Sequence, residues 1–156
     1  MLKKLRVFIY IAVCQVSGII GTVFTGSKIE SWYLAELIRP SFAPPNWLFG
    51  PVWIILYTLM GIAWYLVWCE KKSKLRTQGL WMFGIQLVLN ALWTPIFFGA
   101  QALALSSMVI VLLWGSIIAT MYFFYHIKKI TAYILIPYLV WVSFASVLNI
   151  AIWVLN

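Results

Sequence analysis

Charged residues are scarce in this chain. Only 9% of its 156 residues are Asp, Glu, Lys or Arg, three residues are acidic, and one is histidine. Soluble domains contain about 25% charged residues, so this composition excludes an ordinary water-soluble domain. The chain is instead 65% hydrophobic and 18% aromatic. Such a sequence also excludes intrinsic disorder, which requires few apolar residues and many charges.

Few residues are equipped for acid–base, metal or disulfide chemistry. The long apolar runs contain no Asp, Glu, Lys or Arg. Ion-coupled transporters, hydrolases and zinc sites depend on ionisable groups, so the sequence argues against all three and predicts no metal site. His126, beside Lys128 at the end of a run, is interpreted as an interfacial residue. Cys14 and Cys69 lie in or beside apolar stretches and are interpreted as free thiols.

The charged residues divide the chain into four apolar segments, each long enough to cross a membrane. A transmembrane helix requires about 20 apolar residues. The third segment is long enough for two helices, because residues 99–101 follow Pro95 and predict a turn. We therefore expect one all-α integral membrane domain over residues 1–156, a bundle of five transmembrane helices. They are expected at about residues 7–24, 47–69, 78–98, 102–125 and 131–153. A cleaved signal peptide is the alternative interpretation of the first span.

Basic residues are distributed unevenly between the two sides of this membrane domain. One side contains only Lys28 and Arg39. The side of the N-terminus contains nine basic residues: Lys3, Lys4, Arg6, Lys71, Lys72, Lys74, Arg76, Lys128 and Lys129. The positive-inside rule then predicts a multi-pass protein with the N-terminus inside and the C-terminus outside. A bacterial cytoplasmic membrane is the expected location. A net charge of +8 would suggest nucleic acid in a soluble protein, but here we expect the bilayer as partner and no nucleic acid.

The one long connection, residues 25–46, lies outside in this topology. Residues 30–38 are typical of two helical turns, and the prolines Pro40, Pro44 and Pro45 favour an extended chain after them. Two explanations fit Trp32 and Tyr33 equally well. They form either an interfacial aromatic belt or part of a functional loop over the bundle.

Aromatic and amide side chains recur at helical spacing in the second, third and fifth spans. Amide groups in lipid require partners, so Gln86, Asn90 and Asn149 should face the bundle. For any single residue, helix packing is the favoured explanation of the pattern over ligand binding. Counted from the outer ends of the helices, however, these groups occupy one layer below the proline-rich connection. The layer predicts a pocket for a flat apolar molecule, in which the small Ala145 leaves room.

The order and spacing of these residues resemble the TspO/MBR family, which includes the tryptophan-rich sensory proteins of bacteria and the mitochondrial translocator protein, or peripheral-type benzodiazepine receptor. The resemblance covers essentially the whole chain. It is carried by Trp32-Tyr33, Pro40-Ser41-Phe42-Ala43-Pro44-Pro45-Asn46-Trp47, Gly50-Pro51-Val52-Trp53, Tyr57, Met60-Gly61, Gln86, Asn90, Trp93, Phe97-Phe98-Gly99-Ala100, Pro137-Tyr138, Trp141, Phe144-Ala145, Leu148-Asn149 and Trp153.

The resemblance implies a five-helix bundle, often a homodimer, with a long loop between its first two helices. It implies binding of porphyrins, namely protoporphyrin and haem-type tetrapyrroles, and of synthetic ligands such as isoquinoline carboxamides, with no other cofactor required. The ligand is expected beneath the loop. Family positions that contact ligand correspond here to Tyr33, Pro44, Phe49, Trp53, Tyr57, Asn90, Trp93, Phe97, Trp141, Ala145 and Leu148.

Three functions remain open at this point. A membrane receptor or sensor for porphyrins is the favoured interpretation. Some bacterial members are reported to degrade protoporphyrin, and the tryptophans implicated match Trp53 and Trp141. These would be the catalytic residues of a light- and oxygen-dependent enzyme. A tetrapyrrole transporter is the third function, disfavoured by the lack of an ion pathway.

The chain departs from the family pattern at several positions. Phe42 replaces the usual tryptophan, and Ala43 and Asn46 replace histidines of mitochondrial members, which argues against iron ligation by the loop. The sterol motif of the last helix and the G-x-x-x-G of the third helix are both missing. Small residues such as Gly18 and Gly21 in the first helix still permit close helix packing. The interface of a homodimer is therefore left open.

Overall fold

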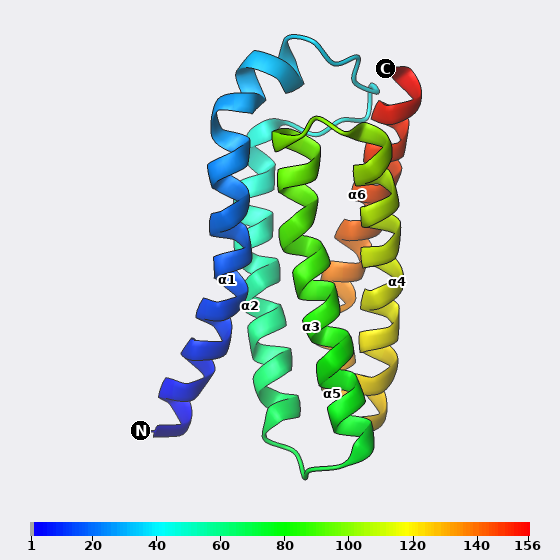
Figure 1. Cartoon of the computed structure of the whole chain (residues 1–156). Coiled ribbons are helices and arrows are strands. Elements are labelled where there is room, and N and C mark those ends of the chain that lie inside the picture. Colours follow the sequence, from blue (N-terminus) through cyan, green and yellow to red (C-terminus); the bar gives the residue numbers. More distant parts are fainter. Residues whose placement is uncertain (1) are drawn as a thin grey trace.

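The computed structural model describes the backbone of residues 2–156 and the side chains of residues 6–26 and 28–156. The described chain is a bundle of long helices with its two termini at opposite ends (Figure 1). Five helical segments are long and apolar enough to cross a membrane: Arg6–Gly26, Asn46–Trp68, Lys74–Gly99, Leu103–Ile127 and Lys129–Leu155. The prediction of an all-α membrane protein with five transmembrane helices is confirmed.

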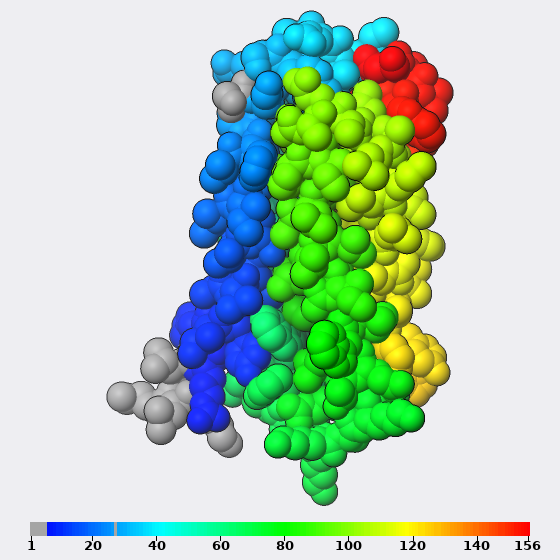
Figure 2. Space-filling view, in the orientation of Figure 1, coloured from blue at the N-terminus to red at the C-terminus, as the bar shows by residue number. Residues whose placement is uncertain are grey.

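The first two long helices are joined by the longest connection of the described chain. Helix α1 (Leu2–Lys28) continues into the π-helical segment η1 (Ile29–Leu34). Residues 35–45, called the first loop below, lead to the short 3₁₀ segment η2 (Asn46–Leu48) and to α2 (Phe49–Trp68). The space-filling view shows the segment after α1 lying across one end of the bundle (Figure 2). This segment therefore covers whatever space the helices enclose at that end.

The connection differs in detail from its prediction. The two expected helical turns at residues 30–38 are one π-helical segment that ends at Leu34. The extended chain after it contains a turn, closed by a hydrogen bond from the Ala43 N–H to the Pro40 carbonyl at 3.0 Å. Trp32 and Tyr33 are buried rather than lipid-facing, which favours the functional-loop interpretation over an aromatic belt. Their burial explains why the helix widens locally into π-helical geometry instead of continuing as a regular α-helix.

Local sequence signals set the ends of the remaining helices. Ser73 caps α3 (Lys74–Thr94), because its Oγ accepts the Arg76 N–H at 3.1 Å. Helix α3 continues as the π-helical segment η3 (Pro95–Gly99). Gln101 follows with a positive φ of 54°, so the chain turns where residues 99–101 were expected to turn it. Helix α4 (Leu103–Ile127) then begins.

The last membrane segment consists of two helices. Helix α5 (Lys129–Ile134) and helix α6 (Ile136–Leu155) are separated by Leu135. Pro137 explains the break, because proline has no N–H to donate to the carbonyl four residues earlier. The predicted last span, residues 131–153, therefore crosses an interruption near its N-terminal end.

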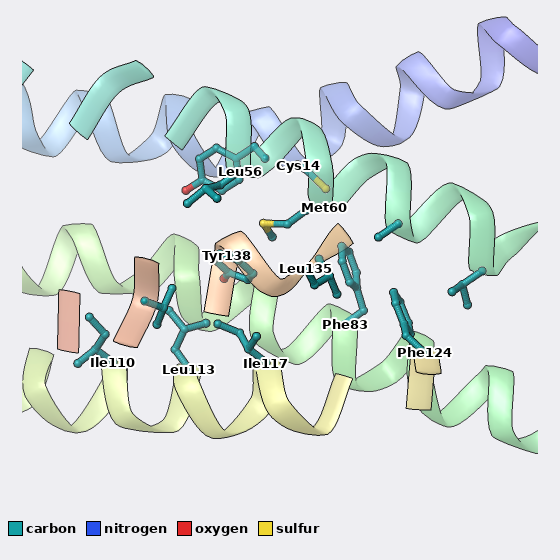
Figure 3. Packing of buried hydrophobic residues seen from close by; sticks show 14 residues of the cluster. Cys14, Leu56, Met60, Phe83, Ile110, Leu113, Ile117, Phe124, Leu135 and Tyr138 are labelled. Atoms are coloured by element: carbon teal, nitrogen blue, oxygen red, sulfur yellow. The ribbon is translucent and has the colours of Figure 1, made fainter. Parts of the chain in front are cut away.

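The helices pack in pairs around one apolar core. Helix α1 lies against α2, α3 against α4, and α4 against α6. Figure 3 shows the centre of this core, where Met60, Phe83, Phe124 and Tyr138 are fully buried. The rings of Phe83 and Phe124 are stacked, with centroids 5.8 Å apart. The outward-facing side chains of the same helices are also apolar, as in a bundle surrounded by lipid.

Several smaller predictions also have a definite outcome. Cys14 is a buried free thiol and Cys69 an exposed one, as predicted. His126 is exposed, and its Nδ1 lies 2.8 Å from the Tyr122 carbonyl of its own helix. The side chains of Lys3 and Lys4, which contribute to the predicted charge asymmetry, lie outside the described residues.

Candidate functional site

A cavity of about 600 Å³ lies in the half of the bundle that the first loop covers. Its wall is formed by residues of α1, α2, α3, α4 and α6. Ten of the eleven residues expected to bind ligand line this one cavity: Tyr33, Phe49, Trp53, Tyr57, Asn90, Trp93, Phe97, Trp141, Ala145 and Leu148. The eleventh, Pro44, is half-buried in the first loop and is not among the lining residues, whereas Asn46 and Trp47 are. The structure thus brings together residues from helices far apart in sequence.

Nine of the residues that line the cavity are aromatic. Trp93 and Phe97 are stacked with centroids 5.1 Å apart and an interplanar angle of 22°. Phe49 meets the Trp141 ring edge to face, with centroids 5.7 Å apart. A second stack joins Trp53 to Tyr57 at 5.3 Å. Such rings offer flat apolar faces to a ligand and lose little conformational freedom when one binds.

The residues of η1 close the cavity at the loop end. Trp32 packs against Phe97, with centroids 5.6 Å apart, and Tyr33 packs against Phe98 at 5.8 Å. The guanidinium carbon of Arg39 lies 5.6 Å from the centre of the Tyr33 ring. Burial raises the pKa of the Tyr33 phenol, and the Arg39 guanidinium opposes this shift. The phenol is therefore protonated at neutral pH and can donate a hydrogen bond at the cavity entrance.

A chain of buried polar groups forms the floor of the cavity. The Tyr57 hydroxyl donates to Oδ1 of Asn90 at 2.6 Å, and Nδ2 of Asn90 lies 3.1 Å from the Tyr138 hydroxyl. The Tyr138 hydroxyl in turn donates to Oε1 of Gln86 at 2.8 Å. The predicted burial of both amides is confirmed, because Gln86 and Asn90 are 1% and 4% exposed. These bonds fix the position of Tyr57 and therefore that of the Trp53 ring, which is stacked on Tyr57.

Asn149, the third predicted amide, holds the Trp93 ring in place. The Trp93 indole N–H donates to Oδ1 of Asn149 at 2.9 Å. Nδ2 of Asn149 donates to the hydroxyls of Ser107 and Ser106 on α4, at 2.7 and 3.3 Å. Asn149 is 2% exposed, so the prediction that it faces the bundle is confirmed. The orientation of one wall ring is thus determined by three helices.

The indole of Trp141 differs from that of Trp93. Trp141 lines the cavity, yet its Nε1 is buried without a hydrogen-bond partner among the described residues. Leaving a buried donor unpaired costs about 1–3 kcal/mol. An acceptor on a bound molecule would remove this cost. Among the residues of the wall, Trp141 is therefore one whose indole N–H stays unpaired within the described residues.

Helix α1 contributes one wall of the cavity, although none of its residues was predicted to bind ligand. Gly18 and Gly21 line the cavity, and a Cβ on Gly18 would lie 2.7 Å from the Tyr57 ring. The small residues noticed in the sequence therefore serve packing within the bundle. Gln15 lies on the same wall, and its Nε2 donates to the Ile54 carbonyl at 3.0 Å. Gln15 is the one amide in this apolar span, a signal from which the wall could have been predicted.

Known proteins of one family match nearly the full length of this chain. The sequence profile of the TspO/MBR family matches residues 10–154. The Tryptophan-rich protein TspO of Chlorobaculum tepidum is 45% identical over 150 residues, covering 94% of this chain and 92% of that protein. Protein CrtK of Rhodobacter capsulatus is 38% identical over 149 residues, covering 95% and 91%. The human Translocator protein is 38% identical over 136 residues, covering 86% and 80%.

Proposed function

Because the chain belongs to the TspO/MBR family, we propose that it is a membrane receptor for porphyrins and other flat apolar molecules. Protoporphyrin and haem-type tetrapyrroles are the expected ligands, and the cavity beneath the first loop is the expected site. The proposal is carried by one observation, the convergence of ten expected positions on one aromatic cavity. A volume of about 600 Å³ lies within the usual range for small-molecule sites, about 300–1,000 Å³.

The charges around the cavity suggest how a porphyrin would be oriented. The described lining residues include no Asp, Glu, Lys, Arg or His, so the macrocycle rather than its carboxylates belongs between the rings. Arg39 lies at the loop end, over Tyr33. We therefore place the two propionate groups toward the first loop, where Arg39 attracts them and Tyr33 can donate to them.

The test is a titration of the purified protein with protoporphyrin in detergent, followed by absorbance and tryptophan fluorescence. We expect saturable binding, which Arg39→Gln weakens about 5–100-fold by loss of a charge-assisted hydrogen bond. Lys129→Gln, which removes a positive charge from the opposite end of the bundle, serves as the control and should bind normally. A neutral isoquinoline carboxamide should be insensitive to both substitutions. Non-saturable binding of protoporphyrin would overturn the proposal.

A second function is supported by the position of two oxidisable rings. Trp53 and Trp141 line the same cavity, and Trp53 is stacked on Tyr57. If protoporphyrin is degraded there in light, with dioxygen as the oxidant, these indoles would exchange electrons with the excited macrocycle. Trp53→Phe and Trp141→Phe should then abolish light- and oxygen-dependent loss of absorbance while binding falls only modestly. Equal bleaching in wild type, both variants and protein-free detergent would restrict the function to binding.

The orientation in the membrane belongs to the same proposal. We place the N-terminus in the cytoplasm and the first loop, the cavity and the C-terminus on the outer side of a bacterial cytoplasmic membrane. The reason is the asymmetry of nine basic residues against two. A reporter fused after Asn156 should be active outside, and one inserted in the loop after α2 should be active inside. The opposite pattern in native membranes would reverse the topology.

A further inference from the structure

Arg76 is a buried cation at the end of the bundle opposite to the cavity. It lies in the first turn of α3 and is only 8% exposed. Among the described residues its Nε has no hydrogen-bond partner, and the one ion pair joins Lys128 to Glu70 instead, at 2.8 Å. A guanidinium does not lose its charge in proteins, and burying it without an anion or an acceptor is unfavourable. The described residues therefore supply neither an acceptor for this nitrogen nor an anion for the guanidinium.

The chain has no spare carboxylate to meet this need. Its acidic residues are Glu30, Glu36 and Glu70. Glu30 and Glu36 lie in and after η1, at the other end of the bundle (Figure 1). Glu70 is paired with Lys128. An anion that compensates Arg76 must therefore come from outside the chain.

Aromatic rings surround this guanidinium on the side of α1 and α2. The guanidinium carbon of Arg76 lies 5.1 Å from the centre of the Trp68 ring. Tyr10 packs against Trp64 and Trp68, with centroids 4.8 and 6.1 Å away. Tyr10 and Arg76 therefore lie against the same ring, that of Trp68. Arg6 precedes Tyr10 by four residues on α1, so its side chain lies on the same face of that helix.

The cluster lies where the membrane-spanning segments begin and end. The first span begins at Arg6, the second ends at Trp68, and the third begins at Lys74. This is the level of the lipid headgroups, where phosphate is the abundant anion. Guanidinium groups bind phosphate through two parallel hydrogen bonds, and a phenol can donate a third. The surrounding Lys71, Lys72 and Lys74 are exposed and add attraction for anionic lipids.

We propose that Arg76, Arg6 and Tyr10 bind the phosphate of an anionic phospholipid at the inner end of α1, α2 and α3. The phosphate compensates the buried charge of Arg76 and gives its guanidinium the missing acceptor. A lipid fits better than free phosphate, because the adjoining surface is apolar. Phe8 is 64% exposed and Trp68 is 49% exposed, so acyl chains can cover them.

The test compares phosphatidylglycerol with phosphatidylcholine on the purified full-length chain in detergent. Native mass spectrometry should show preferential retention of phosphatidylglycerol, and this lipid should raise the melting temperature of the wild type. In Arg76→Gln we expect the preference to fall at least tenfold and the thermal shift to disappear. Lys72→Gln removes one exposed charge from the same region and should retain both effects. Equal losses in the two variants would show only diffuse attraction and would overturn the site.

Two further experiments identify the anion and distinguish loss of the site from misfolding. Inorganic phosphate at millimolar concentration should give no comparable thermal shift, and an equal shift would overturn the lipid as occupant. Arg76→Lys keeps the charge but loses Nε and the planar fork, so it should recover only part of the preference. Full recovery would contradict recognition by the guanidinium. Protoporphyrin affinity reports on the fold, because Arg76 is remote from the cavity, and it should be unchanged in all folded variants.

Discussion

Asn90 joins two tyrosines across the floor of the cavity, and its amide uses both ends to do so. Oδ1 accepts from Tyr57 and Nδ2 donates to the Tyr138 hydroxyl. The Tyr138 hydroxyl then donates to Gln86. All four side chains are buried in the membrane bundle, where water cannot supply hydrogen-bond partners. These bonds provide the partners instead. The chain of bonds therefore stabilises the fold and also determines the shape of the cavity.

Replacing Asn90 by leucine should destabilise the protein by about 1–3 kcal/mol, since the buried Tyr57 hydroxyl loses its acceptor. Tyr57→Phe removes that hydroxyl. In the double variant no donor is left unpaired, so the combined loss should be smaller than the sum of the two single losses. Thermal unfolding of the four proteins in one detergent measures the cycle. Strict additivity would show that the two side chains do not interact.

Ala145 leaves space in the wall one helical turn from Trp141. Ala145→Thr adds volume at a half-buried lining position, and overpacking of this kind costs about 1–3 kcal/mol. We expect protoporphyrin to bind about 5–100-fold more weakly, with the melting temperature nearly unchanged. Ala119→Thr is the control, because Ala119 is half-buried on α4 and is not among the lining residues. Equal affinity of wild type and Ala145→Thr would place Ala145 outside the site.

At the residue scale, the sequence predicted which side chains turn inward but not what they contact. Gln86, Asn90 and Asn149 had to be buried, because an amide facing lipid has no partner. Their actual partners depend on helix rotation and on residues such as Ser106 and Ser107, which have no distinctive spacing. Gly18 and Gly21 were noticed as small, but only the crossing of α1 over α2 and α3 shows that they line the cavity.

At the scale of helices, Gly61 sets the closest approach of α1 to α2. A Cβ at Gly61 would lie 2.5 Å from the Cα and 2.7 Å from the N of Ile11. These are backbone atoms, so no side-chain rotation relieves the contact. Above this crossing the Gly18 position lies against the Tyr57 ring, and below it Tyr10 packs against Trp64. The crossing at Gly61 therefore positions α1 both at the cavity and at the opposite end of the bundle.

Gly61→Ala should lower the free energy of unfolding by at least about 1–3 kcal/mol, because α1 must move away from α2. Gly84→Ala provides a matched comparison. No neighbouring atom lies within 4 Å of a Cβ at Gly84, so alanine there should be neutral or stabilising by up to about 1 kcal/mol. The melting temperature and the affinity for protoporphyrin should both fall in Gly61→Ala and not in Gly84→Ala. Similar melting temperatures in the two variants would contradict the close crossing.

Helix positions followed from the distribution of charge, whereas irregular segments did not. Uncharged runs in lipid have to form helices, so the five long helices were predictable from composition and spacing. The break at Leu135 has a local cause in Pro137, although the periodic pattern continues through it. The π-helical segment at residues 29–34 has no comparable signal. It results from packing Trp32 and Tyr33 onto Phe97 and Phe98, a contact between distant parts of the chain.

At the scale of the whole molecule, the first loop is tied to the last residue of the sequence. The Ile38 N–H donates to Oδ1 of Asn156, and Nδ2 of Asn156 donates to the Ile38 carbonyl, both at 2.9 Å. The same Nδ2 also donates to the Ile152 carbonyl at 2.8 Å, at the end of α6. The covering segment is thus attached to the bundle through α6 as well as through its own ends.

This attachment predicts a kinetic role for Asn156. Asn156→Ala removes both bonds to Ile38, each worth about 0.5–1.5 kcal/mol, at an exposed contact remote from the ring stacks. The loop should then open more often, so protoporphyrin should associate and dissociate roughly 5–100-fold faster. The dissociation constant should change little, because the lining residues are untouched. Stopped-flow quenching of tryptophan fluorescence measures both rates.

Val154→Ala, on an exposed face of the same helical end, is the control and should exchange ligand at the wild-type rate. Unchanged rates in Asn156→Ala would show that ligand passes into the cavity without movement of the first loop.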